Sequence, residues 1–294
     1  MNLKRYVIHG IARAGRTTAA LLAVSLYCLA PLFCPAAPAA ADAVTNGLDR
    51  IREIALSDPH EFTFAVFGDN RGSTDVFERL LSSVSEDPDI RFAVSTGDIV
   101  GAGSPERFNF FLSQVNRYLT KPLVYAVGNH EQFGGGGALY SSLIGSRDYS
   151  FVFGDASFII ADDTKPNGID ADGEALLAKE LSAGDDSGET FVFMHVPLYD
   201  PVGTDIHHSL NPSAAARLIG LFKEHRVTHI FCSHIHGYYQ GTWGGIPFTI
   251  SGGAGAPLIG SDPAHYFYHY LKVHVAHGAV TIETVPVSDD SIKN

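Results

Sequence analysis

The chain has 294 residues, of which 45% are hydrophobic and 18% are charged, and its formal net charge is −12. It is long and apolar enough to form one large domain with a sizeable core, and its composition is not that of a disordered chain. Because 32 acidic residues stand against 20 basic ones, the chain is a poor candidate for binding nucleic acid or anionic lipid as its main role.

The N-terminal segment has the pattern of a secretory signal peptide. Four basic residues come first, and they are Lys4, Arg5, Arg13 and Arg16. An apolar stretch over residues 18–30 and a run of small residues over 35–41 follow. We therefore expect a signal peptide at residues 1–41, cleavage near Ala41, and a secreted or periplasmic protein.

The alternative is that this segment stays attached as a membrane anchor. Its apolar stretch is short for a membrane span, which takes ~20 residues, and Pro31 interrupts the end of the stretch. We therefore expect no stable membrane span after cleavage, and a single domain over residues 44–294.

From residue 62 the sequence alternates between strand and helix patterns. Apolar runs over residues 62–67, 90–95 and 121–127 predict three strands, and helical spacing of apolar residues predicts helices over 74–85 and 108–119. Strands that alternate with helices pair in parallel through right-handed crossovers. Binding sites in such sheets lie at the carboxyl ends of the strands.

The second half of the chain adds strands of both directions. Residues 149–161 predict two strands joined by a tight turn at Gly154 and Asp155. Further elements are expected as helices over 174–181 and 213–225, strands over 191–194 and 227–232, and several antiparallel strands over 247–287. The predicted fold is therefore an α/β domain in which two packed mixed sheets are flanked by helices.

Polar side chains gather at the ends of five predicted strands. They occur in Gly68-Asp69-Asn70-Arg71, Gly97-Asp98, Gly128-Asn129-His130-Glu131, His195, and Ser233-His234-Ile235-His236. Each group alone can be an ordinary turn, since Gly-Asp pairs are common in turns and single histidines are usually solvated. Turns do not require imidazoles, however, and carboxylate, amide oxygen and imidazole together are ligands of divalent cations. The set therefore predicts a metal site.

This ordered set of motifs resembles that of the calcineurin-like metallophosphoesterase superfamily, over about residues 62–257. The resemblance implies a two-metal phosphoesterase with a four-layer αββα sandwich. It implies that Asp98 bridges two metals, that Asp69 and His236 bind the first metal, and that the second is bound by Asn129, His195 and His234. His130 would protonate the leaving group or steady the phosphate, and Glu131 would orient His130.

The implied chemistry suits an acidic protein. Two cations ~3.5–4 Å apart clamp phosphoryl oxygens and lower the pKa of a bridging water. The bound metals therefore supply the positive charge that attracts an anionic ester. This ligand set accepts Mn, Fe or Zn, so it does not specify which metal is bound. Asp98 and His130 are the expected catalytic residues, and Arg71 and Asn129 the expected substrate contacts.

One residue departs from the family pattern. The first motif is usually Asp-x-His, whereas Arg71 stands at the position of the histidine. Arginine stays protonated and cannot donate a lone pair to a cation. The first site is then weak or absent, or Arg71 binds a phosphate oxygen, or it forms a surface ion pair. Purple acid phosphatases also lack this histidine, but they have a tyrosine three residues after the bridging aspartate, where this chain has Gly101.

The sequence thus predicts an exported, metal-dependent enzyme that hydrolyses a phosphate monoester or diester with metal-activated water. The alternative is a metal-stabilised protein that binds a phosphate ligand with little or no turnover, because Arg71 weakens the first metal site. The choice of substrate depends on the loops predicted at residues 133–147, 164–172 and 200–212.

Overall fold

The computed structural model describes residues 41–165, 168–203 and 208–288. Apart from Ala41, the predicted signal peptide lies outside the described residues. Within these ranges, no helix is both long enough and apolar enough to cross a bilayer.

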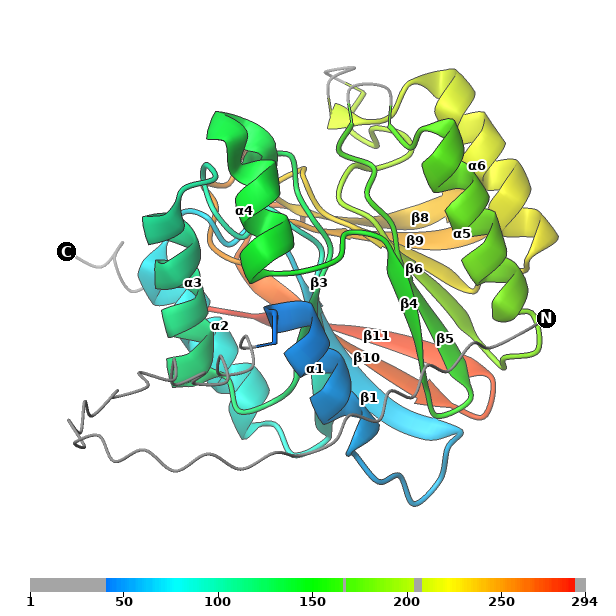
Figure 1. Ribbon diagram of the computed structural model, residues 1–294, viewed down its shortest axis with the longest axis horizontal. Coiled ribbons are helices and arrows are strands. Elements are labelled where there is room, and N and C mark those ends of the chain that lie inside the picture. The colour runs from blue at the N-terminus through cyan, green and yellow to red at the C-terminus, as the bar shows by residue number, and fades with distance from the viewer. Residues whose placement is uncertain (1–40, 166–167, 204–207, 289–294) are drawn as a thin grey trace, which may run out of the picture. The chain divides into compact units, whose positions relative to one another are not determined.

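Two sheets form the centre of the fold (Figure 1). The first has the strand order β11-β10-β1-β2-β3, and its strands are β1 (Glu61–Phe67), β2 (Ile90–Ser95), β3 (Leu123–Tyr125), β10 (His269–Ala276) and β11 (Ala279–Pro286). The second has the order β4-β5-β6-β7-β9-β8, and its strands are β4 (Tyr149–Phe153), β5 (Ala156–Ile160), β6 (Thr190–Phe193), β7 (His229–Cys232), β8 (Tyr238–Trp243) and β9 (Ile246–Ser251). β1, β2 and β3 are mutually parallel, as are β5, β6, β7 and β9.

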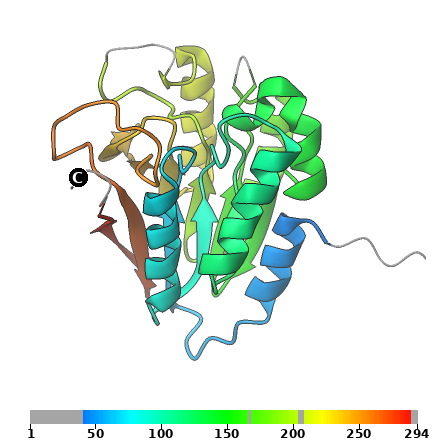
Figure 2. The same cartoon turned by 90° about the vertical axis from the view of Figure 1, so that its left-hand side faces the viewer.

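Helices cover the outer face of each sheet. The helices are α1 (Ala43–Arg52), α2 (Thr74–Glu86), α3 (Pro105–Tyr118), α4 (Gly136–Leu143), α5 (Ala171–Ala183), α6 (Pro212–Glu224) and a short 3-10 helix, η1 (His130–Gly135). α2 and α3 lie side by side against the first sheet, and α5 and α6 lie against the second (Figures 1 and 2). The prediction of two packed mixed sheets flanked by helices is confirmed.

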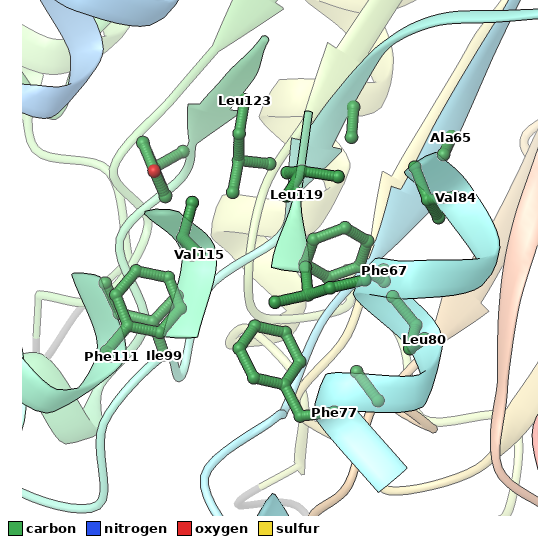
Figure 3. Close-up of a cluster of buried hydrophobic side chains, with 14 of the residues drawn as sticks. Ala65, Phe67, Phe77, Leu80, Val84, Ile99, Phe111, Val115, Leu119 and Leu123 are labelled. Atoms are coloured by element: carbon green, nitrogen blue, oxygen red, sulfur yellow. The ribbon is translucent and has the colours of Figure 1, made fainter. Parts of the chain in front are cut away.

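The central strand β1 shows why its sequence is apolar at consecutive positions. Phe64 and Val66 pack between the two sheets, whereas Ala65 and Phe67 pack against the helices (Figure 3). Successive side chains of a strand point to opposite faces, so a strand covered on both sides must be apolar throughout. Phe64 meets Phe158 of the other sheet edge-on at a centroid distance of 5.2 Å.

Four elements escape the sequence prediction, and they are α1, η1, α4 and β8. α1 contains Gly47, a poor helix former, yet the glycine is required because a Cβ there would lie 2.2 Å from the Leu123 carbonyl oxygen. α4 lies within the glycine-rich stretch that was predicted as the loop 133–147. β8 forms a hairpin with β9 through Gly244 and Gly245, both of which have positive φ.

Two buried histidines are expected to make the fold sensitive to acid. Burial lowers the pKa of His229 and of His269 to about 4; His229 Nε2 lies 3.0 Å from Thr249 Oγ1 and His269 Nε2 lies 3.1 Å from Ser251 Oγ. The unfolded chain takes up these protons near pH 6.5, so stability present above that pH is lost as the pH falls toward 4. Through each histidine, lowering the pH from 7 to 5 should reduce the free energy of unfolding by roughly 1–2 kcal/mol.

Denaturant titration at the two pH values measures this loss. His229→Gln and His269→Gln should each flatten the pH dependence, whereas His277→Asn, at a side chain that is 63% exposed, should leave it unchanged. An unaltered pH dependence in both glutamine variants would show that other groups cause the acid sensitivity.

Candidate metal centre

The structure brings the six predicted metal ligands together at one edge of the two sheets. Asp69, Asp98 and Asn129 follow the first sheet's parallel strands, and the three histidines, His195, His234 and His236, follow β6 and β7. Asp69, Asp98 and His195 each place a ligand atom within 4.8 Å of the others. Residues far apart in the chain therefore converge as the strand-end argument predicts.

Three of these ligands have a strained backbone. Five non-glycine residues in the described ranges have positive φ, and Asp69 (58°), Asp98 (53°) and His234 (68°) are among them. This conformation costs about 1 kcal/mol or more for each such residue and persists only where the surrounding structure enforces it. Each of the three residues stands just after a strand, at the edge where the predicted ligands converge.

Four ligand atoms surround the second metal position. His195 Nε2 lies 3.0 Å from Asn129 Oδ1, 3.2 Å from His234 Nδ1 and 3.4 Å from Asp98 Oδ1. A cation ~2.1 Å from each ligand would set neighbouring ligand atoms ~3.0–3.4 Å apart in octahedral or tetrahedral coordination. The observed separations therefore fit a bound divalent cation.

The hydrogen bonds of His195 point its lone pair at this position. His195 Nδ1 lies 2.9 Å from the Thr96 carbonyl oxygen, which can only accept, so Nδ1 carries the proton and Nε2 is free to ligate. Burial lowers the pKa of His195, but the Asp98 and Asp69 carboxylates outweigh it and raise the pKa to about 8. The centre therefore attracts positive charge, as a metal cation or, without one, as a proton.

The first metal position contains an arginine side chain. Arg71 Nε donates to Asp98 Oδ2 at 3.0 Å, and Arg71 Nη2 donates to His236 Nε2 at 3.1 Å. Asp69 Oδ2 accepts from the His234 N–H at 2.7 Å. Asp69 Oδ1 is buried and has no hydrogen-bond partner among the described residues. Arg71 is thus neither a metal ligand nor part of a surface ion pair, since Asp98 is only 1% exposed.

Glu131 holds the loops that carry Asp98 and Asn129. Its carboxylate accepts from the backbone N–H groups of Gly128 at 2.6 Å, Asp98 at 3.0 Å and Val100 at 3.1 Å. The His130 ring is oriented instead by the Gly101 carbonyl, 2.9 Å from Nδ1. The expected role of Glu131 is therefore corrected: it positions the two loops rather than the imidazole.

Sequence reasoning missed one buried carboxylate beside the centre. Asp163 accepts from the backbone N–H groups of His195 at 3.1 Å and Val196 at 2.8 Å, and burial raises its pKa to about 7. It stands just after β5, a strand-end position like those of the other site residues, and this signal could have found it. Asp163 fixes the loop from which His195 projects.

The family model for calcineurin-like phosphoesterases matches residues 54–238, and this range contains all six predicted metal ligands. The chain belongs to the calcineurin-like phosphoesterase family. Family membership and the converging ligand atoms of Asp69, Asp98 and His195 support a metal-dependent hydrolase of phosphoric esters. A comparison with curated protein sequences gives no match.

Several solved structures share the fold of this calcineurin-like phosphoesterase. The purple acid phosphatase PPD1 from yellow lupin (Lupinus luteus) seeds aligns with a TM-score of 0.64 and 17% identity, over 78% of this chain and 53% of the lupin chain. PhoD aligns with a TM-score of 0.58 and 12% identity, over 78% of this chain and 69% of the PhoD chain. GAP50, the anchor in the inner membrane complex of Plasmodium, aligns with a TM-score of 0.54 and 14% identity, over 78% of this chain and 90% of the GAP50 chain. The chain thus spans about half the length of the lupin protein, and at these identities the likeness concerns the fold alone.

As the sequence predicts, the phosphoesterase departs from the purple acid phosphatase pattern at Gly101. A Cβ at this glycine would lie 2.9 Å from Arg107 Nη1. The guanidinium of Arg107, on α3, therefore occupies the space beside Gly101.

Proposed function

We propose that the chain is an exported enzyme that hydrolyses phosphate monoesters or diesters at the cluster of Asp98, Asn129, His195 and His234. The observation that carries this proposal is the set of 3.0–3.4 Å separations among their ligand atoms. Export rests on the signal-peptide pattern of residues 1–41.

A divalent cation held by these residues would lower the pKa of a water nucleophile and polarise the phosphoryl group. Asp98 would help to hold this cation through Oδ1, which lies beside His195 Nε2, while its Oδ2 accepts from Arg71 Nε. Arg71 keeps further N–H donors for a phosphoryl oxygen, because only two of its five are used in these bonds. His130 Nε2 lies 3.8 Å from Asp98 Oδ2, and in its protonated form it can donate to the leaving oxygen.

Metal removal tests the proposal. Protein treated with a chelator and desalted should hydrolyse neither aryl phosphate monoesters nor bis-aryl diesters, and added Mn²⁺, Fe²⁺ or Zn²⁺ should restore hydrolysis of at least one class. Tight binding of metal and inorganic phosphate without turnover of any ester would instead favour the binding-protein alternative.

A secreted or periplasmic product with its N-terminus near Asp42 supports export, and a product that retains residues 1–41 contradicts cleavage.

The organic group of the substrate has a candidate position beside Arg71. A hollow of about 290 Å³ is lined by Arg71, by the loop 99–101, and by Arg107 and Phe110 of α3. Phe110 is 53% exposed, and Phe133, 50% exposed, stands edge-on to the His130 ring at 4.8 Å. Exposed aromatic rings next to a phosphate site favour an ester with a flat, apolar leaving group.

Phe110→Ala is therefore expected to raise KM for an aryl phosphate by about two- to tenfold with little change in kcat. The loss of one aromatic contact is worth ~0.5–1.5 kcal/mol, and it affects binding of the ground state and the transition state alike. Steady-state kinetics with an aryl and a methyl ester measure the effect, with Val152→Ala, at an exposed position on β4, as the control. An equal change for both esters would place the leaving group elsewhere.

A further inference from the structure

We propose that the Arg71 guanidinium replaces the first metal of the family's two-metal site, so that the active centre works with one bound metal and one fixed organic cation. This inference rests on the proposed function for its catalytic meaning. It concerns which residues bind metal, however, so it can be tested without activity.

Two of the three ligand atoms of the first position are occupied by hydrogen bonds from Arg71. His236 Nδ1 lies 2.7 Å from the Pro257 carbonyl oxygen, which can only accept, so Nδ1 carries the proton. The lone pair of His236 therefore lies on Nε2, the atom that a first metal would use, and Arg71 Nη2 donates to it at 3.1 Å. Arg71 Nε donates to Asp98 Oδ2 at 3.0 Å. Two of the three predicted ligand atoms are thus bound to arginine.

The remaining ligand does not make a site. Asp69 Oδ2 is engaged by the His234 N–H, which leaves Oδ1. A single carboxylate oxygen falls short of the three protein ligands that a catalytic zinc centre uses. Oδ1 lies 3.5 Å from His236 Nε2.

The backbone holds the guanidinium in this position. Asn70 Nδ2 donates to the Ile99 carbonyl at 3.1 Å, which ties the Arg71 turn to the loop after β2. A Cβ on Gly72 would lie 2.4 Å from the Gly255 carbonyl oxygen, so the turn packs directly on the segment that also holds His236 through Pro257. The Arg71 side chain is only 22% exposed. The Arg71 side chain is therefore a fixed, mostly buried part of the centre rather than a mobile surface group.

The exchange keeps a positive charge on the far side of Asp98 while changing its chemistry. A guanidinium stays protonated at every physiological pH and cannot be removed by a chelator. It can offer paired N–H donors to a phosphoryl oxygen, but it cannot activate water as a metal does. Nucleophile activation therefore falls to the second position alone.

Metal counting tests the inference. Each protein is loaded with Mn²⁺, freed of excess metal on a desalting column, and measured by elemental mass spectrometry. Wild type and His236→Gln should each retain about one ion per chain, His234→Gln much less than one, and Arg71→His about two. In the Arg71→His background, adding His236→Gln should return the count to one. Electron paramagnetic resonance should show an isolated Mn²⁺ ion in wild type and an exchange-coupled pair in Arg71→His.

Two ions per wild-type chain would overturn the inference, and so would a loss of metal in His236→Gln. A folded Arg71→His variant that still holds one ion would also overturn it, because the arginine would not be what excludes the second metal. One ion without hydrolysis of any ester would contradict the proposed function alone. Two ions with hydrolysis would contradict the single-metal inference alone.

Discussion

Asp98→Asn is expected to lower kcat/KM for an aryl phosphate by on the order of 100- to 1000-fold, a cost typical of removing a group that stabilises charge in the transition state. Asp98 Oδ1 faces the second metal position and Oδ2 binds Arg71, so the amide weakens contact with both cations at once. Asparagine is the apt replacement because it tolerates the positive φ of 53° at this position. Titration with Mn²⁺ should show a weaker metal affinity in the same variant.

The matched control is His225→Ala. His225 caps α6, near the start of β7 and away from the strand end that carries the centre, and it pairs with Asp185 at 3.0 Å. The His225→Ala variant should keep kcat/KM within about threefold of the wild-type value, as expected for a residue outside the site. Near wild-type hydrolysis and metal affinity in Asp98→Asn would remove Asp98 from the mechanism.

His130→Gln is expected to reduce kcat by about 100- to 10,000-fold for alkyl esters, but far less for nitrophenyl esters, since general acid catalysis contributes most when the leaving oxygen is strongly basic. The Gly101 carbonyl fixes the ring through Nδ1, and Nε2 remains available toward the centre. The measurement is the dependence of log kcat on leaving-group pKa, which should become steeper in the variant.

Gln132→Ala provides the neighbouring control on η1, because the Gln132 side chain donates to Thr164 rather than to a residue of the centre. It should leave the leaving-group dependence unchanged. An equal loss for all leaving groups in His130→Gln would mean that the histidine steadies the phosphate and does not deliver a proton.

Much of this architecture follows from local pattern. Residues 64–67 and 92–94 are apolar at consecutive positions because both faces of β1 and β2 are covered there, and such runs are read directly from the sequence. Parallel strands end at the same edge, so Asp69 and Asp98 were expected to meet, and the structure places them together.

Other features depend on tertiary contacts that no local pattern encodes. The position of Arg71 is set by Asp98 and His236, which lie 27 and 165 residues away in the chain. Glu131 stands next to His130, yet its hydrogen bonds run to the loop after β2. α1 contains Gly47, which has a low helix propensity, and the close approach to β3 that requires this glycine is visible only in the fold.

Crystals grown with Mn²⁺ and measured for anomalous scattering test the central claim most directly. One strong peak bounded by Asp98, Asn129, His195 and His234, with the Arg71 side chain beside it, is the predicted result. Crystals that hold Mn²⁺ elsewhere, or that show no peak among these four side chains, would contradict the assignment of this cluster as the metal centre.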